Sequence, residues 1–183
     1  MFNRLLALLL LLITLPVFLF IAILICIEDG FPTFFKQKRV GINYNFFYIY
    51  KFRSMKKNTP NVATHLLQNP EQYLLKIGGL LRKSSLDELP NLINIIKGDM
   101  GFVGPRPALY NQDDLMTLRI AVGVEKLKPG ITGWAQINGR DEISLEDKVA
   151  LEKEYLGRKT FWFDLKIILF TIGSIIRSKG VNH

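Results

Sequence analysis

The sequence is poor in the residues that build disulfides and common metal centres. Its 183 residues include one cysteine, Cys26, and two histidines, His65 and His183. One cysteine excludes an internal disulfide and a cysteine-based metal site. The two histidines are far apart and lack the spacing of a metal-ligand pair. Secreted disulfide scaffolds and histidine-based metallohydrolases are therefore poor interpretations, and a cytosol-facing protein fits better.

Several sequence motifs are also missing. No G-x-x-x-x-G-K-[ST] loop occurs, which argues against P-loop kinases and NTPases. No nucleic-acid-binding motif is present, and the aromatic and basic residues do not alternate as in a stacking platform. No internal repeat or low-complexity tract divides the chain. The length therefore accommodates one domain, or one domain with a membrane element.

The charge of the chain is unevenly distributed. Its formal net charge is +8, from 24 Lys and Arg against 16 Asp and Glu. Arg4 is the only charged residue before Glu28, so nearly all the basic excess follows the N-terminal segment. Such a balance favours anionic partners, such as phosphates, nucleotides or acidic lipids.

Residues 5–27 form an uncharged apolar run of 23 residues. As a helix this run is about 34 Å long, enough to cross a hydrocarbon core of about 30 Å. A spanning helix is the first interpretation, but Pro16 divides the run into halves about one leaflet deep, and proline kinks helices. A re-entrant helix that turns back at the kink is the alternative. The cations that follow the run place its C-terminal side in the cytoplasm by the positive-inside rule: Lys36, Lys38, Arg39, Lys51, Arg53, Lys56 and Lys57.

The rest of the chain alternates short strands, helices and loops. Residues 34–40 and 46–53, separated by GINYN, predict a β-hairpin. Lys51 and Arg53 share one face of the second strand, either as a solvated basic edge or as a pair of anion ligands. Residues 161–177 predict an amphipathic helix that lies on a membrane or in the core. A loop is predicted over 58–70, a short helical or irregular segment over 72–82, and helices over 113–126 and 144–155.

An acidic pair, Asp87 and Glu88, occurs in SSLDELPNLINIIKGDMGFVGPRP. One interpretation is structural. Ser85 and Glu88 fit the S-x-x-E capping box of a helix that stops at Gly98. This accounts for Glu88 but gives Asp87 no role.

The second interpretation is chemical. Asp87 and Glu88 are followed by a Gly/Pro loop that contains one arginine, Arg106. A carboxylate held ionised beside a phosphate, with a divalent cation to offset repulsion, can act as a nucleophile. Neighbouring residues on a helix diverge by about 100°, so the two carboxylates would have different roles.

Three separated motifs resemble the bacterial sugar transferase family, the monotopic phosphoglycosyl transferases. They are YKFRSM at 50–55, LRKSSLDELPNLINIIKGDMGFVGPRP at 81–107, and KPGITGWAQINGR at 128–140. The resemblance covers nearly the whole chain. It implies an α+β fold, mostly helical and monotopic, with a re-entrant helix hairpin over residues 1–28 and a cytoplasmic-face catalytic domain over 29–183. It also implies a β-hairpin and interfacial amphipathic helices.

The same resemblance implies an activity and its location. The enzyme would transfer a sugar 1-phosphate from a UDP-sugar to undecaprenyl phosphate and release UMP, at the bacterial inner membrane among membrane lipids. Asp87 would be the nucleophile and Glu88 the Mg²⁺ ligand. The residues expected to bind substrate are Lys51, Arg53, Arg82, Arg106, Gln136, Arg140 and Asp164.

Two matters stay open at this level. A non-catalytic, membrane-tethered anion-binding or scaffold protein is the competing interpretation of the basic charge. The sequence does not identify the sugar, the glycan pathway or the oligomeric state.

Overall fold

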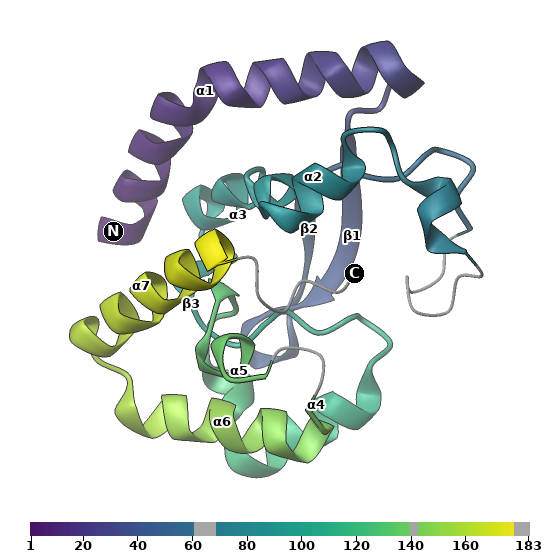
Figure 1. Cartoon of the computed structure of the whole chain (residues 1–183). Coiled ribbons are helices and arrows are strands. Elements are labelled where there is room, and N and C mark those ends of the chain that lie inside the picture. The colour runs from purple at the N-terminus through teal and green to yellow at the C-terminus, as the bar shows by residue number, and fades with distance from the viewer. Residues whose placement is uncertain (61–68, 140–142, 178–183) are drawn as a thin grey trace.

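The computed structural model describes residues 1–60, 69–139 and 143–177 (Figure 1). The mixed, mostly helical fold predicted from the sequence is confirmed. The helices are α1 Phe2–Asp29, α2 Gly78–Lys83, α3 Asn91–Lys97, α4 Asp113–Val122, α5 Trp134–Ile137, α6 Leu145–Arg158 and α7 Phe161–Arg177. The strands are β1 Phe34–Val40, β2 Phe46–Phe52, β3 Gly101–Val103 and β4 Gly130–Thr132.

The apolar N-terminal run forms a single bent helix, α1, rather than two helices separated by a break (Figure 1). Pro16 lies inside it and has no N–H to donate to the preceding turn. Close to the bend, Thr14 donates its hydroxyl to the carbonyl of Leu10 at 2.7 Å. The helix is long and apolar enough to cross a membrane. Most of its large apolar side chains are exposed, and only Ala7, Ile21 and Ile25 are buried.

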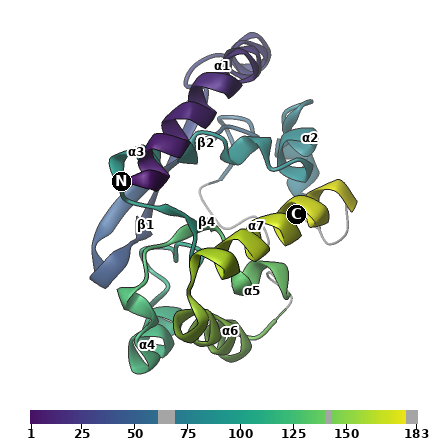
Figure 2. The same ribbon diagram turned by 90° about the vertical axis from the view of Figure 1, so that its left-hand side faces the viewer.

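Both ends of α1 contact the same folded unit. The N-terminal half lies along α3 (Figure 2), and a methyl group added to Gly98 would come within 2.1 Å of the Arg4 guanidinium. At the other end Arg53 forms an ion pair with Asp29 and donates to the carbonyl of Gly30 at 2.6 Å. The N-terminal end of α1 therefore packs against α3, and polar contacts hold its C-terminal end to the strand-end residue Arg53.

The predicted β-hairpin is confirmed. β1 and β2 pair antiparallel, with Phe34 opposite Phe52 and Val40 opposite Phe46. Asn94 of α3 is fully buried and binds the β2 backbone, donating to the carbonyl of Tyr48 at 2.7 Å and accepting from the amide of Tyr50 at 3.2 Å. This double contact fixes α3 against the strand that carries Lys51.

The capping-box prediction is wrong. Ser85 has a left-handed backbone conformation (φ 58°) and makes no side-chain capping hydrogen bond. Asp87 and Glu88 lie in a short 3₁₀ turn, Leu86–Glu88, and α3 begins only at Asn91. The turn leaves Glu88 free to face β2 instead of its own backbone. Gly98 ends α3 as predicted, with φ 95°.

Two glycine-rich segments, far apart in sequence, join through the parallel pair β3–β4. Gly104 donates to the carbonyl of Thr132 at 2.9 Å, and Gly130 donates to the carbonyl of Pro105 at 3.0 Å. A Cβ on Gly104 would lie 2.2 Å from the carbonyl oxygen of Lys128, so only glycine permits this backbone approach. The pairing places the GPRP loop beside the segment that carries Gln136.

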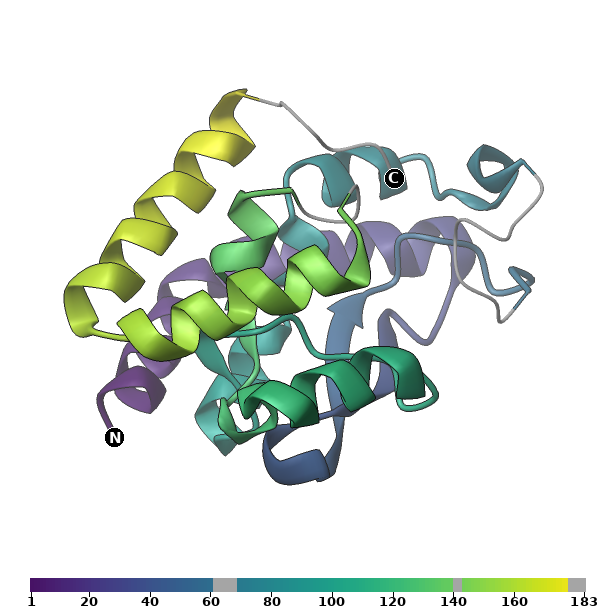
Figure 3. The same cartoon turned by 90° about the horizontal axis from the view of Figure 1, so that it is seen from below.

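Helices α4 and α6 lie side by side (Figure 3). α6 begins at the predicted serine, since the Ser144 hydroxyl accepts from the amide of Asp147 at 3.0 Å. The predicted amphipathic helix at the C-terminus is α7, with one face in the core and an apolar face that is exposed. Phe163 and Ile167 are buried in the core, whereas Trp162, at 75% exposed, lies on an apolar outer face with Leu169 and Phe170.

Candidate active site

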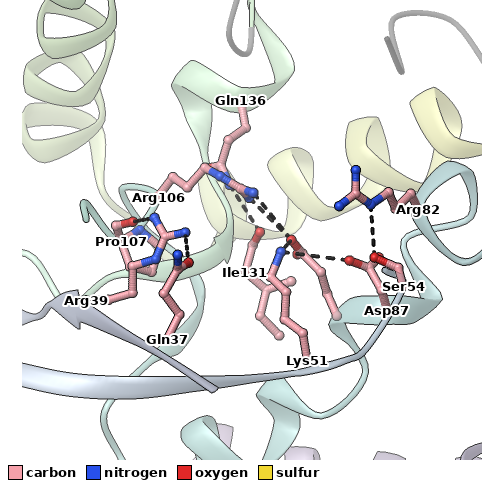
Figure 4. A network of polar contacts seen from close by, with 11 residues as sticks. Gln37, Arg39, Lys51, Ser54, Arg82, Asp87, Arg106, Pro107, Ile131 and Gln136 are labelled. Atoms are coloured by element: carbon pink, nitrogen blue, oxygen red, sulfur yellow. Dashed lines mark hydrogen bonds and ion pairs between the residues drawn. The ribbon is translucent and has the colours of Figure 1, made fainter. Parts of the chain in front are cut away.

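The acidic pair meets a lysine from the hairpin (Figure 4). Lys51 Nζ lies 2.7 Å from Glu88 Oε1 and 3.9 Å from Asp87 Oδ2. All three side chains are largely buried, with 12–18% of each exposed. The β2 strand therefore supplies one cation that both carboxylates share.

The GPRP loop supplies a second cation. The Arg106 guanidinium reaches Glu88 Oε1 at 3.4 and 3.5 Å through its two terminal nitrogens. Its backbone carbonyl accepts from Arg119 Nη2 at 3.0 Å, and Arg119 is itself buried in an ion pair with Glu152. Arg119 thus fixes the backbone of the GPRP loop, while the Arg106 side chain points to Glu88.

Arg82 flanks Asp87 on the other side (Figure 4). Its Nε donates to the Ser54 hydroxyl at 2.9 Å, and its charge interacts with the Asp87 carboxylate. Three of the predicted phosphate-binding cations, on β2, α2 and the GPRP loop, therefore converge on the acidic pair.

The electrostatics differ between the two carboxyl groups. Burial raises the pKa of Asp87, although Lys51 and Arg82 oppose the shift. Burial also acts to raise the pKa of Glu88, but Lys51 and Arg106 outweigh it and lower the pKa to about 2. Glu88 is thus firmly ionised, while Asp87 is a carboxylate of raised basicity, which suits an attacking group better than a strongly paired one.

Of the remaining predicted residues, Arg53 and Asp164 lie away from the acidic pair, Gln136 lies beside Arg106 (Figure 4), and Arg140 is outside the described residues. Arg53 binds the C-terminal end of α1 through Asp29. Asp164 accepts from the Tyr155 hydroxyl at 2.7 Å. Gln136 donates to the carbonyl of Ile131 at 3.1 Å, beside Arg106 in Figure 4. Arg140 lies outside the described residues.

The sequence interpretation missed two residues at this site. A small cleft beside Glu88 is lined in part by Arg39 and Asn91. Arg39 had been counted only among the cations that follow the apolar run. Its position opposite Phe47 in the hairpin, with an isolated bridge to Leu109, brings it to the GPRP loop. The available signal was the Q-x-R-x-G pattern at the end of β1, but its position next to the GPRP loop follows only from the fold.

The donor set fits an anion better than a bare metal ion. In the described ranges 1–60, 69–139 and 143–177, no three His, Cys, Asp or Glu side chains gather as a metal site. The ionised Glu88 is an oxygen donor suited to Mg²⁺, but cations surround it. Mg²⁺ typically takes one or two carboxylates and completes its shell with water and phosphate oxygens. The residues therefore fit Mg²⁺ as a companion of bound phosphate.

Comparisons with known proteins identify the family of the chain. The sequence model of the family described as bacterial sugar transferase matches residues 1–178. The sugar transferase EpsL of Bacillus subtilis (strain 168) is 42% identical over 183 residues, covering 100% of this chain and 89% of EpsL. The exopolysaccharide production protein ExoY of Rhizobium meliloti (strain 1021) is 36% identical over 90% of this chain and 79% of ExoY.

A third relative has a more specific name. The UDP-glucose:undecaprenyl-phosphate glucose-1-phosphate transferase of Escherichia coli (strain K12) is 39% identical over 175 residues. The match covers 91% of this chain but 38% of that protein. The chain thus spans nearly all of some relatives and well under half of this one.

Proposed function

The chain belongs to the bacterial sugar transferase family and is a transferase, and from that premise we propose that it moves a sugar 1-phosphate from a UDP-sugar to undecaprenyl phosphate and initiates a cell-surface glycan. The observation that carries the proposal is the buried Asp87 with Lys51, Arg82 and Arg106 around the acidic pair. A cationic site that holds one carboxylate of raised pKa suits attack on a diphosphate.

The proposed reaction has two displacements at one phosphorus atom. A carboxylate oxygen of Asp87 attacks the β-phosphorus of the UDP-sugar, and the bond to the bridging oxygen breaks. UMP leaves with that electron pair, and an aspartyl phosphosugar remains. A phosphate oxygen of undecaprenyl phosphate then attacks the same phosphorus and releases the carboxylate, giving undecaprenyl diphosphosugar.

The surrounding cations have defined parts in this scheme. Lys51 lies between the two carboxylates and is placed to neutralise charge at the attacked phosphate. Arg106, on an exposed loop, is placed to bind the departing UMP phosphate through its fork of donors. Glu88 would hold Mg²⁺ together with the donor phosphates, and the ion would neutralise their charge.

Release of UMP tests the proposal. Purified full-length protein is incubated with a panel of UDP-sugars, undecaprenyl phosphate and Mg²⁺. We expect UMP release from at least one UDP-sugar, dependent on the lipid for multiple turnovers and abolished by chelation of Mg²⁺. Absence of release from every donor, in protein that binds UDP, would contradict the proposed activity and favour the anion-binding alternative.

We further propose that α1 is re-entrant, with the catalytic domain on the cytoplasmic face of the bacterial inner membrane. A straight span would put the two ends of the helix on opposite faces. Here Arg4 packs against Gly98, and Asp29 pairs with Arg53, so both polar ends lie on the domain. The bend at Pro16 and the exposed apolar middle of α1 support insertion from one side. The exposed Trp162 and Phe170 of α7 suit the same interface.

Cysteine labelling distinguishes the two topologies. In a Cys26→Ser background, Asn3→Cys and Lys57→Cys are each labelled with a membrane-impermeant maleimide in intact spheroplasts and after permeabilisation. We expect both sites to be protected in intact spheroplasts and labelled after permeabilisation, because both flank one membrane face. Labelling of Asn3→Cys alone in intact spheroplasts would indicate a spanning helix.

A further inference from the structure

A cleft lies next to the acidic pair, between the hairpin, α3 and the GPRP loop. Its walls carry more positive than negative charge, with Arg39, Lys51 and Arg106 against the one carboxylate of Glu88. An excess of cations in a half-buried cleft is costly unless an anion joins them. The remaining polar lining residue is Asn91, and the apolar and backbone lining comes from Ile49, Met100, Pro107, Gly130 and Ile131.

Asn91 gives independent evidence that the cleft receives a polar ligand. Its side chain is 3% exposed, and its Oδ1 has no hydrogen-bond partner in the described structure. An amide oxygen accepts hydrogen bonds, so a buried Oδ1 without a partner marks a place for a donor, such as a water molecule or a hydroxyl of the ligand, and not for the phosphate oxygens themselves.

Arg39 is held rigidly at the edge of the cleft. Its Nη1 donates to the carbonyl of Pro107 at 3.0 Å, and its Nη2 donates to Gln37 Oε1 at 2.5 Å. Its Nε is buried and has no hydrogen-bond partner among the described residues (Figure 4). The guanidinium is thus fixed by both the hairpin and the GPRP loop, and each terminal nitrogen, which carries two N–H groups, makes one of these hydrogen bonds. Such pre-organisation lowers the entropic cost of binding an anion.

We propose that Arg39 is a donor-binding residue whose guanidinium, beside Lys51 and Arg106, holds a phosphate group of a nucleoside diphosphate. This assignment rests on the proposed function and extends the site beyond the acidic pair and the GPRP arginine. Arginine suits the role because its planar fork matches phosphate oxygens.

The electrostatics of Arg39 agree with the assignment. Burial, and then the charge of Arg106, lower the pKa of Arg39 to about 10, while Glu88 opposes the shift. A bound phosphate would favour the charged guanidinium and offset the repulsion between the two arginines.

Nucleotide binding by Arg39→Gln tests the proposal, with Lys38→Gln as the matched control. Lys38 precedes Arg39 on β1, but its ammonium lies over the rings of Phe46 and Tyr110, 4.2 and 5.5 Å from their centroids. Affinities for UDP and for uridine are measured by titration of the full-length protein in detergent. We expect Arg39→Gln to weaken UDP binding about tenfold to a hundredfold, as for a lost hydrogen bond to a charged group. Uridine binding should change less than twofold, and Lys38→Gln should bind both ligands as the wild type does.

Three results would overturn the assignment. Arg39→Gln could bind UDP as tightly as Lys38→Gln, which would exclude a phosphate contact. It could lose UDP and uridine affinity equally, which would indicate that Arg39 only positions the GPRP loop through Pro107. Finally, Arg39→Lys could bind UDP as weakly as Arg39→Gln does, and high salt could leave UDP binding by the wild type unchanged. These two results together would exclude a contact between charges. The proposed function would be contradicted by a different result: wild-type protein that binds UDP but converts no UDP-sugar.

Discussion

Replacement of Asp87 by asparagine is expected to lower UMP release by about 10³-fold or more, since losses of this order follow removal of a covalent nucleophile. The substitution keeps the size of a side chain whose residue is 8% exposed but removes the attacking oxygen charge. Because burial raises the pKa of Asp87, the charged form costs stability, so the asparagine variant should fold at least as well. The lost rate would therefore report chemistry and not unfolding.

A trapping experiment makes the assignment specific. Wild-type protein given UDP-sugar without lipid acceptor should release UMP in one stoichiometric burst and gain the mass of one phosphosugar. Asp87→Asn should show neither. Asp114→Asn is the control, because Asp114 is an exposed carboxylate in the first turn of α4. Full turnover by Asp87→Asn, or a mass gain in that variant, would exclude a covalent role for Asp87.

Glu152→Ala is expected to destabilise the fold by about 3–5 kcal/mol, the typical cost of breaking a buried ion pair. Arg119 and Glu152 are 4% and 2% exposed and share two hydrogen bonds, at 2.8 and 2.5 Å. Removing Glu152 leaves the Arg119 guanidinium buried and unbalanced. Since whole domains are stable by only about 5–15 kcal/mol, the change should be visible as a large fall in the urea midpoint.

The chain offers a matched control on the same helix. Glu154 pairs with Arg158 at the surface, with side chains 40% and 51% exposed, and the amide oxygen introduced by Glu154→Gln could still accept from Trp134, so this change should shift the urea midpoint much less than Glu152→Ala. The double variant Arg119→Met/Glu152→Leu should recover most of the stability, because apolar residues of similar volume can replace a buried pair. A Glu152→Ala midpoint equal to that of Glu154→Gln would show that water reaches the pair.

Local signals predicted much of the fold. The hairpin followed from alternation on both sides of GINYN, α6 began at Ser144, and Gly98 ended α3. The capping box failed for a long-range reason. Glu88 matched the local motif, but Lys51, 37 residues earlier in sequence, binds its carboxylate, and Ser85 adopts a left-handed conformation. A local sequence pattern contains no information about a partner that is distant in sequence and becomes a neighbour only in the fold.

The candidate site was predictable in its acidic pair and only partly in its cations. Lys51, Arg82 and Arg106 converge as expected, whereas Arg53 binds the end of α1. The strand alternation that paired Lys51 with Arg53 holds only up to the end of β2 at Phe52. Arg39 was missed because its approach to the GPRP loop depends on hairpin register and on the bridge to Leu109.

The buried Arg119–Glu152 pair illustrates a different limit. On the sequence, each residue belongs to a charged helix and resembles a solvated face. Arg119, however, follows the buried Leu115 and Met116 at helical spacing, and Glu152 lies between the buried Val149 and Tyr155. A charge within an apolar stripe was the available signal, and it needed both helices to be considered together.

The attachment of both ends of α1 to the catalytic domain has a kinetic consequence under the proposed topology. The helix sets one fixed height for Asp87 relative to the bilayer surface, so the acceptor reaches the site by lateral diffusion within the membrane. The encounter rate for that substrate then scales with its mole fraction among the lipids. The nucleotide sugar still arrives from bulk solution in three dimensions. The lipid acceptor would thus reach the active site by diffusion in two dimensions, and the nucleotide sugar by diffusion in three.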